Sequence, residues 1–157
     1  MKRIYLFAGL LAFSLLSFSQ TAVTVDLYKT YQTMTGFGGH DPRDQHTLIN
    51  SDLGATVERI WLDPAFKSSS GGSYNFDAAC QPSKSSILTE KANGVTVFIA
   101  TPWSPPAWMK DNNNVNGGVS ATNVLGKNMY STYADYLVEY AKQFKTQIGI
   151  DLFAISM

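Results

Sequence analysis

The sequence predicts an α/β fold in which parallel β-strands alternate with helices. Residues 95–100, VTVFIA, form an almost unbroken apolar run, which is typical of a parallel strand buried on both faces. Residues 128–148 carry apolar side chains at steps of three and four, the period of an amphipathic helix. The predicted elements follow one another as strand, helix, strand, helix, strand, helix and strand, which favours parallel strands with right-handed crossovers. Two architectures fit this order, an open doubly wound sheet and part of a (β/α)8 barrel.

The N-terminal half contains two predicted strands and one predicted helix. A first strand is expected within 20–31, where apolar and polar residues alternate. After a glycine-rich loop, residues 44–54 predict a short helix that ends at a glycine. Residues 55–62, ATVERIWL, are rich in β-branched and aromatic types and predict the next strand, which stops before Asp63 and the proline that follows it.

The C-terminal half adds a short helix, the apolar strand, a long loop and the amphipathic helix. Residues 82–94 predict the short helix, with Ser83 near its N-cap and Asn-Gly at its end. The loop 101–123 is far longer than an ordinary connection, and its tryptophans and prolines indicate a functional segment. Gly149 ends the amphipathic helix, and residues 150–157 predict a last, buried strand.

The N-terminus has the pattern of a secretory signal peptide. Lys2 and Arg3 precede an apolar run over 4–16, and the small residues of 17–19 follow. The run is too short for a transmembrane helix, which takes about 20 residues. We therefore expect cleavage after residue 19 and a secreted protein, extracellular or periplasmic, without a stable membrane anchor.

Composition excludes some functions. Without the signal segment the chain has two more acidic than basic residues, and its lysines and arginines are scattered, so we expect no nucleic-acid partner. The 20 aromatic residues exceed the needs of a small core and favour a binding cleft. Cys80 is the only cysteine, which rules out an intrachain disulfide and is expected to be an ordinary buried or loop residue.

Four side chains are candidates for ligand binding: Arg59, Asp63, Trp103 and Trp108. Trp103 directly follows the apolar strand, where an indole can offer its apolar face to a sugar, with asparagines 112–114 as partners for hydroxyl groups. The alternative is that either tryptophan only covers the core. Arg59 lies within a strand and needs a partner or a solvated pocket, and Asp63 is the candidate partner. The alternative is a purely structural ion pair with Glu58 or Asp63.

Two other sequence patterns are weaker evidence for a binding site. The glycine-rich loop 36–41 lacks the third glycine of a dinucleotide-binding loop, so no nucleotide is expected there. His40, Asp41, Asp44 and His46 lie close in sequence but lack the spacing of metal ligands. We expect no metal and no other cofactor.

Four segments, taken together and in order, resemble glycoside hydrolase family 30. They are YQTMTGFGG (31–39), ERIWLD (58–63), ATPWSPPAWMK (100–110) and the stretch from YADYLVEYAKQF to the end of the chain (133–157). That family contains glucuronoxylanases, β-1,6-glucanases and glucosylceramidases. The resemblance implies a (β/α)8 barrel with a side β-domain, and retaining hydrolysis by two glutamates.

The resemblance also assigns residues. Arg59 matches the family's strand-two arginine in the sugar pocket, Trp103 matches the tryptophan after strand three, and Asp63 matches an acidic position of the xylanase-like members. The acid/base glutamate of an Asn-Glu-Pro motif and the nucleophile are both expected beyond Met157. No catalytic residue is therefore assigned within this sequence.

These expectations combine into one description of the chain. Residues 1–19 are a signal peptide, 20–31 a leading strand that belongs to the side β-domain, and 32–157 the N-terminal half of a (β/α)8 barrel with about four strands. The chain is expected to be an inactive N-terminal fragment of a secreted retaining glycosidase whose partner is a carbohydrate: xylan, β-1,6-glucan or a glucosylceramide-like lipid. The alternatives are a half-barrel carbohydrate-binding module without catalysis and a doubly wound domain for a small ligand.

Overall fold

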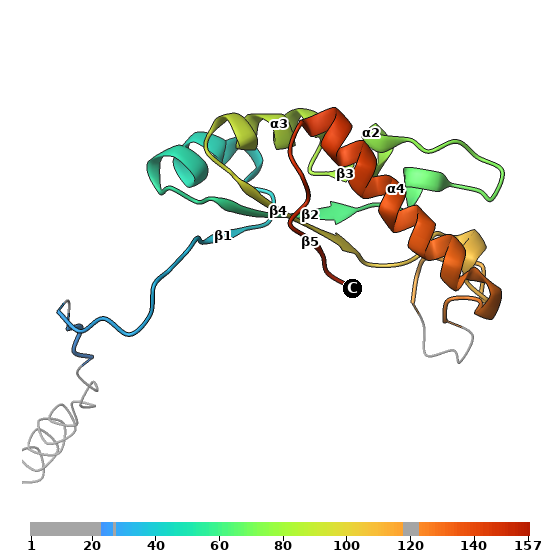
Figure 1. The fold of residues 1–157 in the computed structure, drawn as a ribbon, viewed down its shortest axis with the longest axis horizontal. Coiled ribbons are helices and arrows are strands. Elements are labelled where there is room, and N and C mark those ends of the chain that lie inside the picture. The colour runs from blue at the N-terminus through green and yellow to red at the C-terminus, as the bar shows by residue number, and fades with distance from the viewer. Residues whose placement is uncertain (1–22, 27, 118–122) are drawn as a thin grey trace, which may run out of the picture. The chain divides into compact units, whose positions relative to one another are not determined.

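The computed structural model describes residues 23–26, 28–117 and 123–157, and the chain divides into two units, Met1–Thr33 and Met34–Met157 (Figure 1). The signal segment expected at 1–19 lies outside the described residues. In the first unit, the described residues form no strand, and the main feature is a turn in which the Tyr28 amide donates to Asp26 Oδ1 at 3.0 Å. Of the strand expected within 20–31, the described residues 23–26 and 28–31 form none, because a strand needs a neighbour for its backbone groups and no described strand pairs with them.

The second unit is built on a parallel sheet whose strands follow one another in chain order. β1 (Gly38–Gly39), β2 (Val57–Leu62), β4 (Val97–Pro102) and β5 (Ala154–Ile155) are neighbours in that order and all parallel. The short β3 (Cys80–Gln81) pairs antiparallel with the end of β2. A doubly wound sheet reverses its order at a switch point, whereas a barrel adds each strand beside the last. The order therefore selects the partial barrel over the doubly wound alternative.

The helices lie on one side of these strands, as Figure 1 shows. Between β1 and β2 the chain forms two short irregular helices, η1 (Arg43–Gln45) and η2 (Thr47–Asp52), where one short helix was predicted. The others are α2 (Phe76–Ala79), α3 (Lys84–Ala92) and α4 (Tyr130–Ile148). As predicted, Gly149 ends α4; it adopts φ 76°, a left-handed conformation that suits glycine. No helix in the described part of the chain is both long and apolar enough to cross a bilayer.

The core lies between the helices and the outer face of the sheet. Ile60 of β2 and Phe98 of β4 are fully buried there, and α4 covers them with Tyr140 and Phe144. Tyr136 of the same helix is also fully buried. Aromatic side chains make up a large part of this core, and some of them pack edge to face, such as Phe66 against Tyr140 with centroids 5.2 Å apart.

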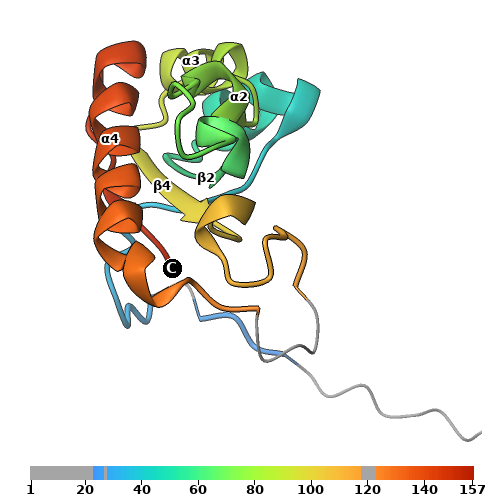
Figure 2. The ribbon, with the colours of Figure 1, turned by 90° about the vertical axis from the view of Figure 1, so that its right-hand side faces the viewer.

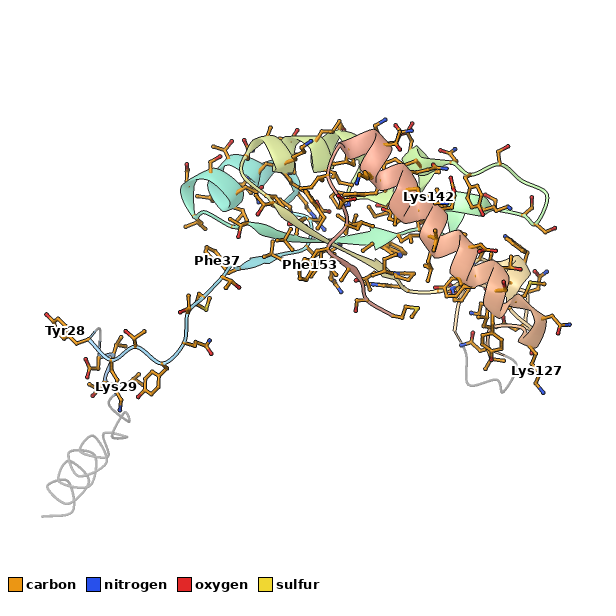
Figure 3. The ribbon with its side chains drawn as sticks, in the orientation of Figure 1. Tyr28, Lys29, Phe37, Lys127, Lys142 and Phe153 are labelled. Atoms are coloured by element: carbon orange, nitrogen blue, oxygen red, sulfur yellow. The ribbon has the colours of Figure 1, made fainter. Side chains whose placement is uncertain are left out.

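The inner face of the sheet is much more open. Arg59 is exposed there, and Trp61 and Ile99 are only half buried, as the side chains drawn in Figure 3 allow the reader to follow. The prediction that the strands are buried on both faces is therefore right for the outer face only. The prediction that the last strand is buried is also wrong, since β5 has two half-buried residues flanked by exposed ones. In a complete barrel this inner face is filled by layers of side chains from the other strands.

Ser83 begins α3 as predicted, and its loss is expected to destabilise the fold. Its hydroxyl accepts a hydrogen bond from the Ser86 amide, which otherwise has no partner in the first helical turn. We expect Ser83→Ala to lower the free energy of unfolding by about 1 kcal/mol in urea titrations. Ser131→Ala is the control, because this exposed serine lies inside α4 rather than at a cap. Equal losses in both variants would contradict the capping role.

Candidate functional site

A cleft of about 400 Å³ opens at the carboxyl ends of β2 and β4. Figure 2 is seen from this end of the strands, with the loop that follows β4 in front. The cleft is formed by the end of β2, the turn η3 (Pro64–Lys67) and the long loop after β4. The side chains that give it character are Trp61, Asp63, Trp103, Ser104, Val115 and Asn116.

Two stacked indoles form one wall of the cleft. The rings of Trp61 and Trp103 lie with centroids 5.0 Å apart and an interplanar angle of 25°. The strand register explains the stack: Trp61 is paired with Thr101, and Trp103 follows two residues later on the same side of the sheet. Trp103 is 64% exposed, so its outer face is available to a ligand. A flat aromatic surface of this kind suits the C–H face of a sugar ring.

Asp63 is fixed beside the stack at the end of β2. Its Oδ1 accepts from the Ala65 amide at 2.8 Å and so caps η3, and its main-chain carbonyl accepts from the Tyr136 hydroxyl at 3.3 Å. The second carboxylate oxygen has no described hydrogen-bond partner. The arrangement places one acceptor of fixed position next to an aromatic platform.

Arg59 lies on the inner face of β2, on the same side as Trp61 but outside the cleft. It lines a separate shallow hollow with Gly38, Gly39 and His40. The expected ion pair with Asp63 or Glu58 is not formed, since no described carboxylate makes a salt bridge with Arg59. The side chain instead faces solvent, which was the other condition under which an arginine is tolerated in a strand.

Trp108 does not line the cleft. Its indole N–H donates to the Lys67 carbonyl oxygen at 2.8 Å, and the Lys67 ammonium lies 5.8 Å from its ring centroid. Trp108 thus joins η4 (Ala107–Met109) to η3, and its geometry favours the covering role that was the alternative to sugar binding.

The asparagines of the long loop mostly serve the loop itself. The side-chain oxygens of Asn112 and Asn114 accept from backbone amides two residues further on, at 3.1 and 2.9 Å. Asn116, which the sequence analysis did not single out, reaches the cleft instead. Trp61 was also missed as a site residue, although the period of two from Arg59 already placed it on the inner face.

A second polar group lies on the opposite, helix-covered side of the sheet. Glu58 and Glu90 are 1% and 0% exposed, and His46 Nδ1 lies 3.6 Å from Glu90 Oε1. Burial raises the pKa of Glu90 to about 8, with Glu58 and then Asp41 adding negative charge nearby. Burial also raises the pKa of Glu58 to about 7, although the Asp41 amide hydrogen bond to its Oε1 opposes the rise. This group is part of the core, away from the cleft.

The remaining titratable candidates do not gather into a metal centre. Within the described ranges no three His, Cys, Asp or Glu side chains are placed to hold one metal ion. Cys80 is buried, and its thiol donates to the Phe76 carbonyl oxygen. Desolvation raises the pKa of that thiol to about 12, which makes it a packing residue rather than a nucleophile.

A parallel sheet wound in chain order, with helices on its outer face and a cleft at the strands' carboxyl ends, defines part of a (β/α)8 barrel. Comparison with known proteins agrees: residues 84–157 match the Glycosyl hydrolase family 30 TIM-barrel domain. Residues 84–157 are thus identified as part of the TIM-barrel domain of glycoside hydrolase family 30.

Individual relatives support this assignment. The chain is 29% identical over 147 residues to glucuronoxylanase XynC of Bacillus subtilis (86% of this chain, 32% of the relative), and 30% identical over 128 residues to an endo-1,6-β-D-glucanase of Neurospora crassa (79% and 26%). Among solved structures, the family 30 subfamily 8 xylanase Xyn30A of Clostridium acetobutylicum superposes with a TM-score of 0.64 at 27% identity, over 82% of this chain and 33% of that one. The chain spans between about a quarter and a third of the length of these relatives.

Proposed function

We propose that this chain supplies part of the sugar-binding cleft of a secreted, retaining glycoside hydrolase that acts on a β-glycan. The observation that carries the proposal is the stack of Trp61 and Trp103 beside Asp63, at the end of the barrel strands where such enzymes bind their substrates. Secretion rests on the signal pattern of residues 1–19, which lies outside the described part of the chain.

Each side chain has a distinct task in the proposal. The exposed face of Trp103 packs against the C–H groups of one sugar ring, and Trp61 supports it from behind. Asp63 accepts a hydrogen bond from a sugar hydroxyl through the carboxylate oxygen that does not cap η3. Arg59 donates hydrogen bonds to the glycan from the inner face of β2, as its exposed position permits.

In the proposal, the described residues of the cleft bind the sugar but do not include the two carboxyl groups that catalysis needs. Retaining hydrolysis needs two carboxyl groups about 5 to 5.5 Å apart, one as nucleophile and one as acid/base. Asp63 is the one carboxyl group among the described residues that line the cleft. We therefore assign it to substrate binding, and we expect the chain by itself to bind glycan without cleaving it.

The substrate is proposed from the relatives. One is named a glucuronoxylanase, another an endo-1,6-β-D-glucanase, and a third a putative glucosylceramidase that matches over a shorter stretch. The first two of these names refer to polysaccharides, and both relatives match over most of this chain. Xylan and β-1,6-glucan are accordingly the first candidates, and a glucose-bearing lipid comes after them.

Calorimetric titration of the full chain with xylo-oligosaccharides and with β-1,6-gluco-oligosaccharides tests the proposal. We expect one of the two series to bind and its affinity to rise with chain length until the cleft is filled. Maltose, an α-linked glucoside, is the control. An absence of binding to both series by a folded chain would contradict the proposal.

A carbohydrate-binding module without catalysis is the second candidate function, favoured by the single carboxyl group in the cleft. Both candidate functions predict that this chain binds glycan. They differ in whether the protein that contains the chain also cleaves the glycan. If a protein that carries this segment within a full barrel releases no reducing sugar from xylan or β-1,6-glucan, the binding module is the better description.

A further inference from the structure

We propose that Lys110 is the positioning residue of the cleft, because its ammonium group joins the segment after Trp103 to the segment before Asn116. The role of the cleft in sugar binding rests on the function proposed above, whereas the contacts of Lys110 do not depend on it.

Lys110 is unusual because it is buried without an acidic partner. It is 9% exposed, and its Nζ donates to Ser104 Oγ at 3.2 Å and to the Val115 carbonyl oxygen at 3.4 Å. No carboxylate in the described segments forms a salt bridge with it. Removing an ammonium group from water is costly, and lysine is rarely buried unless its donors are used. The two acceptors are therefore the reason why this side chain is held where it is.

The base of the Lys110 side chain is fixed by the backbone. Lys110 forms an antiparallel bridge with Leu125. On either side of it, the Gly126 amide donates to the Met109 carbonyl oxygen at 2.8 Å, and the Asp111 amide donates to the Val124 carbonyl oxygen at 3.1 Å. The ammonium group thus extends from an anchored backbone position to the two loop segments that carry its acceptors.

The two acceptors belong to the cleft itself. Ser104 and Val115 both line it, and each is the chain neighbour of another residue that lines it, Trp103 and Asn116 respectively. One cation therefore connects two separate segments of the loop, both of which line the cleft. Without it, the turn that begins at Ser104 loses this tie, and Trp103 is free to leave its stack on Trp61.

Substitution of Lys110 by methionine and by arginine distinguishes the effect of its hydrogen-bond donors from the effect of its bulk. Lys110→Met keeps most of the apolar stem and removes the donors, whereas Lys110→Arg keeps a charge and several donors. Ser104→Ala removes one acceptor only and serves as a second, milder variant in case Lys110→Met does not fold. Lys127→Met is the control, since Lys127 points away from the fold in Figure 3 and is exposed.

The first readout is the exciton couplet that two stacked indoles give in far-ultraviolet circular dichroism, measured on the full chain below its unfolding temperature. We expect Lys110→Met to lose most of the couplet, Ser104→Ala to lose part of it, and Lys110→Arg and Lys127→Met to retain it. An unchanged couplet in both Lys110→Met and Ser104→Ala would overturn the proposal.

The second readout is affinity for the oligosaccharide that binds the unmodified chain. We expect about tenfold weaker binding for Lys110→Met, the size of one charge-assisted hydrogen bond, and recovery in Lys110→Arg. A lost couplet with unchanged affinity would overturn the positioning role. If the unmodified chain shows the couplet but binds no glycan, the proposed function fails. The couplets of the four variants then still decide whether Lys110 holds the Trp61–Trp103 stack.

Discussion

The chain is expected to lose stability as the pH rises through 7 and 8, because two carboxyl groups of the core are neutral in the folded state. Burial raises the pKa of Glu58 to about 7 and that of Glu90 to about 8, from 4.5 in the unfolded chain. A folded-state pKa above the unfolded value gives a contribution that is full below pH 4.5 and lost as the pH rises through the folded value. For either group taken alone, the loss is on the order of 3 to 5 kcal/mol.

The neighbourhood of Glu90 gives the physical reason. Glu90 comes from α3, and it meets Glu58 of β2 and His46 at the start of η2, with Asp41 close enough to add its charge. Neither carboxyl oxygen of Glu90 has a hydrogen-bond partner among the described residues. Ionisation therefore creates a buried charge beside other acids, with one histidine at 3.6 Å as the nearby cation source.

Urea titrations at pH 5, 7 and 9 check the expected loss of stability with rising pH, with Glu90→Gln as the test variant. We expect the variant to match the unmodified chain within about 1 kcal/mol at pH 5 and to be clearly more stable at pH 9, because the amide cannot ionise. Glu139→Gln is the control, since Glu139 lies half exposed on α4. The same loss of stability with pH in Glu90→Gln as in the unmodified chain would contradict the role of Glu90.

Trp103→Ala is expected to weaken glycan binding by about 2 kcal/mol, or roughly 30-fold, while leaving the fold intact. The indole contributes the exposed face of the stack, and no other described ring can replace it in the cleft. Because 64% of the side chain is exposed, its removal takes little from the core. Calorimetric titration gives the affinity, and thermal unfolding gives the stability.

Tyr130→Ala is the matched control for this variant. Tyr130 is 63% exposed, close to the value for Trp103, but lies at the start of α4 outside the cleft. We expect Tyr130→Ala to bind as the unmodified chain does. Equal affinities for all three proteins would show that the ligand does not use the indole platform.

The sequence predicted the framework of the fold because local signals and tertiary structure agree there. Ser83 begins α3 and Gly149 ends α4, at positions where side-chain capping and a left-handed φ are local requirements. The same holds for the strands 57–62 and 97–102, whose residue types favour β structure. The choice between barrel and doubly wound sheet depended on strand order, which βα alternation leaves open and which the family resemblance supplied.

The candidate site could be predicted only in part. Trp103 and Asp63 were found because they follow strands, and the structure brings both into one cleft. The separation of Arg59 from Asp63, and the use of Trp108 as a tie to η3, depend on how loops fold back over the sheet. The Trp61–Trp103 stack required the β2–β4 register, which a single sequence does not specify.

The most direct test of the sugar-binding cleft follows the indole N–H signals of the three tryptophans by two-dimensional NMR during titration with the preferred oligosaccharide. Substitution of each tryptophan in turn assigns the signals. We expect the signals of Trp103 and Trp61 to shift together along one binding curve, and that of Trp108, whose N–H is bonded to the Lys67 carbonyl, to stay in place. A shift of Trp108 alone, or three unmoved signals at saturating sugar, would contradict the placement of the sugar on the Trp61–Trp103 stack.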